Sequence, residues 1–217
     1  MSDSGQLQKL ENMLVEGERV IRSGGVVLVP TETFYALAVD PRQEEAVRRV
    51  FQIKNRNESN ALPLIASSRS VVDEIIALPD GRTQELMSRF WPGSLTILLR
   101  PSIELSRLLI GNRGLIAIRV PPRCPARELA NRSGGLITAT SANLSGAPNP
   151  DEVSKIDLSV VSAVDLVMDL GPTGGTKPST VVEPLGDSLD IRREGVVPGA
   201  MLEEFYKLCL KRLEKDF

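Results

Sequence analysis

The 217-residue sequence predicts a single α/β domain, in which a twisted sheet of mixed parallel and antiparallel strands carries flanking helices. Short apolar runs alternate with amphipathic segments along the chain, as in proteins whose helices pack on a sheet. Several connections between these runs are too short for helical crossovers, so some neighbouring strands must be antiparallel. No linker, internal repeat or low-complexity segment divides the chain, and its length suits one domain.

The first predicted elements are a helix and a buried strand. Leucines recur at helical spacing through residues 6–22, and Gly24-Gly25 ends the pattern. The wholly apolar run at residues 26–30 predicts a strand covered on both faces. Similar patterns predict strands at 62–66, 95–99, 115–120 and 136–140, and helices at 70–78, 82–90 and 125–131.

The C-terminal part predicts a hairpin and a last helix. Residues 180–194 are typical of two antiparallel strands that turn at residues 185–188. Pro198 then opens an amphipathic helix. We therefore expect one main domain over residues 1–199 and a C-terminal helix, residues 200–217, packed on the same domain.

The composition excludes several kinds of active site. The chain has 26 basic and 28 acidic side chains, no histidine, and two widely separated cysteines, Cys124 and Cys209. These counts exclude a zinc site of cysteine and histidine, a disulfide framework and a Ser-His or Cys-His nucleophile. The near-neutral balance disfavours a surface that binds nucleic acid throughout. The sequence has neither a signal peptide nor an apolar run of about 18 residues, so we expect a cytoplasmic protein without membrane contact.

Four unusually polar segments follow predicted strands and helices, where ligands commonly bind in α/β proteins. They lie at residues 30–35, 53–60, 138–146 and 171–180. Each also has a purely structural interpretation, as a turn or a solvated helix end. The last segment differs from a phosphate-binding loop, because Thr176 precedes its lysine, Pro178 follows it and no helix comes after. We interpret this segment as a flexible closing loop.

Four cations are candidates for binding an anion. Lys54 and Arg56 lie two residues apart and could together hold a polyanion, although a solvated helix end is equally compatible. Arg119 interrupts an apolar strand, so we expect it to pair with a carboxylate of the protein or of a ligand. Arg193 lies on the last strand of the hairpin, where a cross-strand ion pair is the alternative.

Six motifs, taken in order, resemble the threonylcarbamoyl-AMP synthase family, also called the YrdC-like domain, from about Ser4 to Gly199. They are Pro30-Thr31-Glu32-Thr33-Phe34-Tyr35, Lys54-Asn55-Arg56, Phe90-Trp91-Pro92-Gly93, Arg119-Val120-Pro121, Ser141-Ala142-Asn143-Leu144-Ser145-Gly146 and Pro178-Ser179-Thr180-Val181-Val182. The resemblance implies a YrdC-like fold with a central concave cleft. It also implies a nucleotidyltransferase that makes threonylcarbamoyl-AMP and pyrophosphate from L-threonine, bicarbonate or CO2, and ATP. Mg2+ would be bound through the ATP phosphates rather than by protein ligands.

The family resemblance also implies roles for particular residues and partners. Lys54 and Arg56 are expected to be catalytic. The residues expected to bind ATP are Lys54, Arg56, Asn60, Ser141, Asn143, Asn149 and Arg193. The residues expected to bind threonine are Thr31, Thr33, Tyr35, Arg119 and Ser179, with Arg119 as the partner of the carboxylate. A separate tRNA threonylcarbamoyl transferase would pass the product to the adenosine 3′ of the anticodon, with at most weak contact between this chain and tRNA.

The sequence departs from the family pattern at three places. Ala36-Leu37-Ala38 replaces the usual Gly-Leu-Gly, and the proline after Asn60 is spaced differently. Longer members carry an extra C-terminal domain, whereas this sequence ends after one helix. A sister group of the same fold also has the Ala-Leu variant but lacks the Ser-Ala-Asn signature, which is intact here at residues 141–143. The intact signature favours the synthase over this sister group. Two other functions stay open as alternatives, namely a relative of carbamoyl-adenylate type and an RNA-binding module. One Trp, two Tyr and five Phe leave few stacking surfaces for RNA.

Overall fold

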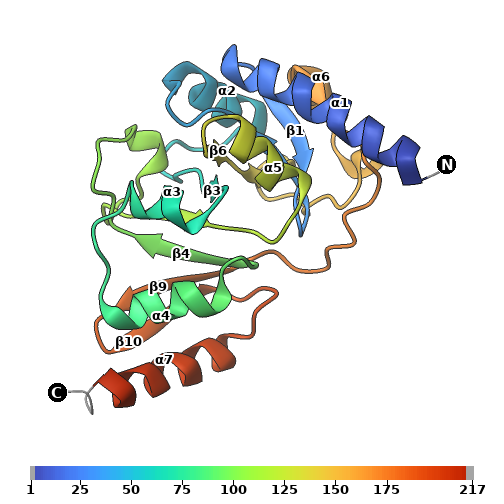
Figure 1. Ribbon diagram of the computed structural model, residues 1–217. Coiled ribbons are helices and arrows are strands. Elements are labelled where there is room, and N and C mark those ends of the chain that lie inside the picture. The colour runs from blue at the N-terminus through green and yellow to red at the C-terminus, as the bar shows by residue number, and fades with distance from the viewer. Residues whose placement is uncertain (1–2, 214–217) are drawn as a thin grey trace.

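Two mixed sheets form the scaffold of the computed structural model, which describes residues 3–213 of the chain (Figure 1). The smaller sheet has the strand order β7-β2-β1-β8, and the larger has the order β10-β9-β4-β5-β3-β6. The strands are β1 (Val27–Pro30), β2 (Tyr35–Ala38), β3 (Leu64–Ala66), β4 (Leu95–Leu99), β5 (Ile116–Arg119), β6 (Leu136–Thr138), β7 (Thr140–Ser141), β8 (Leu166–Val167), β9 (Thr180–Leu185) and β10 (Ser188–Arg193).

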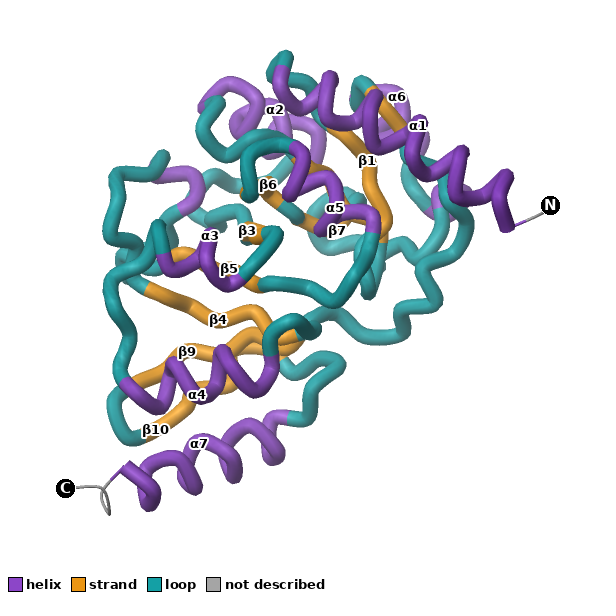
Figure 2. Tube along the Cα trace, viewed as in Figure 1, coloured by secondary structure: helices purple, strands orange, loops and turns teal. Residues whose placement is uncertain are grey.

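Helices cover the two sheets at opposite ends of the molecule (Figure 2). They are α1 (Asp3–Arg22), α2 (Glu44–Lys54), α3 (Arg69–Asp73), α4 (Gly81–Phe90), α5 (Pro125–Arg132), α6 (Leu158–Ala163) and α7 (Gly199–Leu213), with short 3-10 turns η1 (Arg107–Leu109) and η2 (Val153–Lys155). Helix α5 contacts α1, β1 and β3 and so packs against both sheets, whereas α7 contacts α4 and β10. None of the helices within residues 3–213 is long and apolar enough to cross a membrane.

The mixed pairing expected from the sequence is confirmed. Strands β3 and β5, β4 and β9, and β1 and β8 pair in parallel, whereas the other neighbours are antiparallel. The hairpin over residues 180–194 is also confirmed, because β9 and β10 pair with Ser188 opposite Leu185. The strand predicted at 95–99 coincides with β4.

The strand expected at residues 136–140 is two strands in the structure. Residues 136–138 pair with β3 in the larger sheet, and residues 140–141 pair with β2 in the smaller one. The amides of Thr138 and Ala139 donate to Val39 O and Pro63 O respectively, so the chain passes from one sheet to the other at this point. An apolar run does not indicate which partner each residue will meet, and this explains the difference.

Strand β2 and helix α3 also differ from the prediction. Strand β2 was not expected, because its Ala-Leu-Ala sequence has little strand propensity; it forms by folding back on β1, with Ala36 opposite Val29. The helix expected at 70–78 ends at Asp73, since Ile76 instead forms a bridge to Pro101.

The core has two parts. The larger spans both sheets and includes the fully buried Tyr35, Leu64 and Leu95. The smaller lies where α1 and α5 pack on β1 and β3, and Leu14 and Ile21 of α1 are buried in it. Leu7 of the same predicted stripe is instead 66% exposed.

The C-terminal helix α7 packs against α4 and against β10, the edge strand of the larger sheet. Leu202 and Tyr206 of α7 are buried there, and Tyr206 also donates to Gly186 O in the β9–β10 turn. Residues 214–217 of the expected helix lie outside the described part of the chain.

Candidate functional site

Segments that are far apart in the sequence meet around one polar cavity of about 250 Å³. They are the β1–β2 turn, the loop after α2, strands β4 and β5, the β6–β7 crossing and the two ends of the β9–β10 hairpin. Most of the predicted site residues line it, namely Thr31, Thr33, Tyr35, Arg56, Arg119, Ser141, Asn149, Ser179 and Arg193. Three predicted residues, Lys54, Asn60 and Asn143, do not line it.

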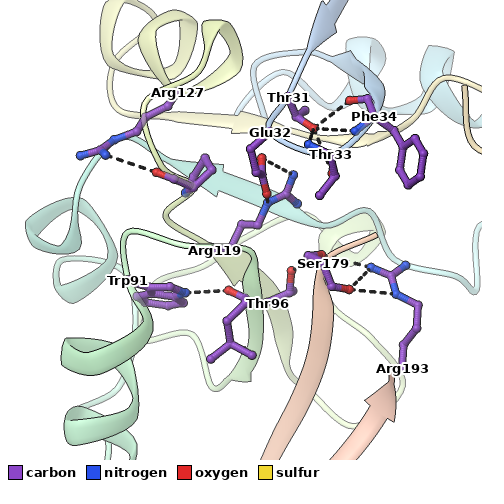
Figure 3. Close-up of polar contacts among 12 residues, drawn as sticks. Thr31, Glu32, Thr33, Phe34, Trp91, Thr96, Arg119, Arg127, Ser179 and Arg193 are labelled. Carbon is purple, nitrogen blue, oxygen red and sulfur yellow. Dashed lines mark hydrogen bonds and ion pairs between the residues drawn. The ribbon is translucent and has the colours of Figure 1, made fainter. Parts of the chain in front are cut away.

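The β1–β2 turn places two threonines at the cavity. The Thr31 hydroxyl donates to Phe34 O (2.7 Å) and accepts from the amides of Thr33 and Phe34. The Thr31 hydroxyl has a single proton, which it donates within the turn. In the 3.1 Å contact between the Thr31 and Thr33 hydroxyls, Thr33 is therefore the donor. Thr31 thus shapes the turn, and the lone pairs of the Thr33 hydroxyl stay available to a ligand (Figure 3).

Arg119 lies at the end of β5 and forms an ion pair inside the protein. Its Nε is 3.1 Å from Oε1 of Glu32, and its Nη2 is 3.5 Å from Oε2. The two side chains are each 7% exposed. The sequence left open whether this arginine pairs with the protein or with a ligand, and the structure supplies the protein partner.

Arg193 and Ser179 form a second arrangement on the β9–β10 hairpin. Nε and Nη2 of Arg193 both donate to Ser179 O, at 3.2 and 2.9 Å, and Nη2 is 3.1 Å from the Ser179 hydroxyl. That hydroxyl also lies 2.9 Å from the hydroxyl of Thr96, which is buried on β4 (Figure 3). Every hydrogen-bond partner of Arg193 among the described residues is neutral, so the cross-strand ion pair considered from the sequence does not form there.

Lys54 is buried behind the cavity wall. The helix ends there because Asn55 adopts the left-handed conformation, and the Lys54 ammonium reaches the β7 segment. Its Nζ donates to Ser141 O, to Asn143 O (2.6 Å) and to Asn143 Oδ1 (3.0 Å). Burial, followed by repulsion from Arg56, lowers the pKa of Lys54 to about 7. In this state all three N–H groups of the ammonium are used to hold residues 141–143 in place.

Residues 141–143 connect this lysine to the cavity. The Ser141 hydroxyl donates to Asn143 Oδ1 at 2.6 Å, and the Asn143 amide group donates to Ala147 O. Asn143 therefore has its side-chain groups occupied within the loop, whereas Ser141 lines the cavity. The Asn143 side chain of this motif thus helps to fix the loop.

The loop after α2 carries the half-buried Arg56. Its Nε donates to Asn60 O at 2.9 Å and its Nη2 to Ala61 O at 3.3 Å. Burial of the guanidinium lowers its pKa. Asn60 itself is exposed and contributes only its backbone to this contact.

The expected closing loop lies against the β1–β2 hairpin. The Thr173 hydroxyl donates to Thr33 O at 2.7 Å, and the Tyr35 hydroxyl donates to Gly171 O at 2.7 Å. A Cβ atom on Gly175 would lie 1.6 Å from Thr33 O, so only glycine allows this close approach. The loop thus borders the part of the cavity that holds Thr33.

The site is electropositive. Arg56, Arg119 and Arg193 line the cavity, and within residues 4–209 no carboxylate joins them in the lining. Desolvation of the Arg193 guanidinium, followed by repulsion from Arg119, lowers the pKa of Arg193. The described residues contain no group of three or more His, Cys, Asp or Glu side chains able to hold a metal ion. Such a site favours anions, and a divalent cation would suit it best as part of a phosphate complex.

Two residues with a clear place in the site were not assigned from the sequence. Thr96 is a polar residue within the apolar strand at 95–99, and that break in the pattern was an available signal. Glu32 belongs to the motif at residues 30–35, but its partner Arg119 is 87 residues away in the sequence, and no local pattern connects the two.

Comparisons with known proteins show which family the chain resembles. A family model described as "Telomere recombination" (Sua5_yciO_yrdC) matches residues 19–195. The chain is 34% identical over 170 residues to the threonylcarbamoyl-AMP synthase of Idiomarina loihiensis, an alignment that covers 76% of this chain and 90% of that protein.

Solved structures show the same fold. The structure of Pyrococcus abyssi Sua5 complexed with L-threonine has a TM-score of 0.83 and 29% identity, and the match covers 90% of this chain but 57% of that one. E. coli YciO has a TM-score of 0.78 and 26% identity, with 88% of this chain and 93% of that one covered. The chain therefore spans little more than half of the Pyrococcus protein and nearly all of the E. coli protein.

Proposed function

Because the chain belongs to the Sua5/YciO/YrdC family, we propose that it condenses L-threonine, bicarbonate or CO2, and ATP into threonylcarbamoyl-AMP and pyrophosphate. Relatives that carry the name threonylcarbamoyl-AMP synthase support this proposal, since one of them is aligned with this chain over 90% of its length. A fold neighbour was solved with L-threonine, which supports threonine as the amino acid.

The observation that carries the proposal is the convergence of three arginines on one cavity with several hydroxyl groups. Arg56, Arg119 and Arg193 come from separate parts of the chain and meet there. This combination suits a triphosphate beside an amino acid, because guanidinium groups bind phosphate and carboxylate oxygens by forked hydrogen bonds.

The reaction needs few proton transfers by the protein. The neutral amine of threonine attacks the carbon of CO2, a C–N bond forms, and the amine loses a proton to give a carbamate. A carbamate oxygen then attacks the α-phosphorus of ATP, while the bond between the α-phosphorus and the bridging oxygen breaks and pyrophosphate leaves. Negative charge grows on phosphate oxygens during this step, and fixed cations stabilise it. A site without histidine is suited to such chemistry.

We assign the two sides of the cavity to the two substrates. Within the described part of the chain, Arg56 and Arg193 have only neutral partners, so their charge is available to the phosphates of MgATP. Arg119, Thr33 and Ser179 are proposed to bind threonine. The Mg2+ ion is part of the nucleotide substrate and keeps several water ligands.

Lys54 receives a role that differs in kind from that of Arg56. Its ammonium is fully bonded to the backbone and side chain of residues 141–143, so we propose that it acts on the reaction by positioning Ser141. A direct contact with a phosphate would require it to give up one of these bonds.

The surrounding steps remain predictions from the resemblance. They comprise a cytoplasmic location, a downstream tRNA threonylcarbamoyl transferase and the modification of adenosine next to the anticodon. Threonylcarbamoyl-AMP is a reactive mixed anhydride, so an acceptor enzyme is required to use it before water does.

Incubation with MgATP, bicarbonate and each amino acid in turn tests the proposal, with pyrophosphate as the readout. We expect pyrophosphate release only when threonine and bicarbonate are both present. Release that needs no threonine would favour a carbamoyl-adenylate type of reaction, and no release at all would refute an adenylating enzyme. RNA binding that weakens steeply with salt, without any turnover, would instead support a binding module.

A further inference from the structure

The ion pair between Glu32 and Arg119 is a buried charge pair at the edge of the substrate cavity. Glu32 comes from the β1–β2 turn and Arg119 from β5, so the pair connects the two sheets (Figure 3). Both side chains are 7% exposed. Pairs this deeply buried cost much free energy in desolvation, and stability alone does not account for them.

The geometry of the pair leaves one edge of the guanidinium free. Glu32 accepts hydrogen bonds from Nε and Nη2 of Arg119. Among the described residues, nothing accepts a hydrogen bond from Nη1, and Arg119 lines the cavity whereas Glu32 does not. The carboxylate therefore fixes the plane of the guanidinium from behind and leaves two N–H groups for a ligand.

Glu32 also differs from the partners of the other two arginines. In the part of the chain that the structure describes, Arg56 and Arg193 donate only to carbonyl or hydroxyl oxygens. Glu32 thus supplies the compensating negative charge for Arg119, which would otherwise repel the nearby Arg193 and withdraw from it.

We propose that Glu32 is a positioning residue that holds Arg119 in the orientation in which Nη1 binds the carboxylate of the amino-acid substrate. This inference rests on the proposed function. The opposite role is a competitor, in which the Glu32 carboxylate occupies Arg119 until a ligand carboxylate displaces it. The position of Glu32 behind Arg119, outside the cavity lining, argues for positioning.

The test compares Glu32→Gln with the wild-type chain by calorimetric titration with L-threonine and, separately, with MgATP. Glutamine keeps the size of the side chain and removes its charge. We expect the threonine Kd to rise about tenfold, as for the loss of one charge-assisted contact, and the MgATP Kd to change less than about twofold. Glu11→Gln is the matched control, because Glu11 forms an ion pair with Arg132 on α1 and α5, away from the cavity.

The kinetic readout separates positioning from a general loss of structure. A contact made equally in the bound substrate and in the transition state changes KM and leaves kcat nearly constant. We therefore expect the threonine KM to rise about tenfold in Glu32→Gln with kcat within about twofold of the wild type. Glu32→Asp, which keeps the charge but is shorter, should give a smaller increase and serves as the second variant if Glu32→Gln does not fold.

Each outcome decides between the roles. Unchanged threonine affinity in Glu32→Gln would overturn the inference, and tighter binding would establish the competitor role instead. If the wild-type chain bound no threonine and released no pyrophosphate with it, the proposed function would fall together with this inference. If the wild type did both and the variant matched it, only this inference would fall.

Discussion

Substitution of Gly175 by alanine gives a sharp test of the contact between the closing loop and the threonine side of the site. The new Cβ atom would lie 1.6 Å from Thr33 O, whereas real contacts of this kind essentially never fall below 3.0 Å. Restoring that minimum requires a shift of about 1.4 Å. If the loop moves away along the bond from Thr173 to Thr33, its 2.7 Å length grows to about 4.1 Å and the bond is lost.

The expected result follows from this displacement. Loss of one or two loop hydrogen bonds costs roughly 1–3 kcal/mol of stability. Because Thr33 lies in the site, we also expect the threonine KM to rise about tenfold, while MgATP binding changes little. The measurements are thermal unfolding and the threonine dependence of pyrophosphate release.

Gly174→Ala is the matched control for this substitution. Gly174 has φ +71, and no atom lies within 4 Å of the position that an alanine Cβ would take, so alanine there adds backbone strain without a clash. We expect this control to lose about 1 kcal/mol of stability and to keep the wild-type threonine KM. Equal KM values for the two variants would refute the reasoning.

Three further predictions concern side chains of the site. Lys54 binds its proton less tightly in the folded protein, with a pKa of about 7, than at its ordinary value of 10.5. Between pH 7 and pH 10.5 the unfolded chain therefore binds more protons than the folded one. Over this range the free energy of unfolding of the wild type should rise with pH relative to that of Lys54→Met, by at most about 5 kcal/mol, as measured by denaturant titration. Arg56→Ala should still fold, at a cost of roughly 1–3 kcal/mol for its two lost loop hydrogen bonds, and should lower the rate of threonine-dependent pyrophosphate release by roughly 100-fold or more. Arg48→Ala on the exposed side of α2 should leave that rate unchanged. Thr96→Val should remove the hydroxyl contact to Ser179 and raise the threonine KM by roughly 3–10-fold in the same assay, and an unchanged KM would exclude Thr96 from the site.

Much of the fold was predictable because its elements carry strong local patterns. The predicted bounds differ by at most one residue from the observed ones for three elements: the strand at 95–99 (β4), the hairpin at 180–194 (β9 and β10) and the helix at 125–131 (α5). The pairing of strands was less accessible, since it depends on contacts between residues distant in the sequence. Residues 136–141 show this limit, because one apolar run serves two sheets.

The sequence predicted which residues belong to the candidate site better than it predicted how their side chains are arranged. Arg56, Arg119 and Arg193 were all candidates from the sequence, and these side chains do meet at one cavity. The spacing of Lys54 and Arg56 did not reveal that the helix end turns the lysine away from that cavity and toward Asn143. Thr31 likewise has a hydroxyl group, but only its bonds to Phe34 show that the turn uses it.

The passage of the chain from β6 to β7 determines how the site can change shape. Only Ala139 separates the two strands. A single residue therefore connects the larger sheet, which contains Arg119, to the strand of the smaller sheet that contains Ser141. A shift of β6 would therefore carry β7 and Ser141 with it. The segment at residues 171–178 belongs to neither sheet, so it can change position without the loss of any strand pairing.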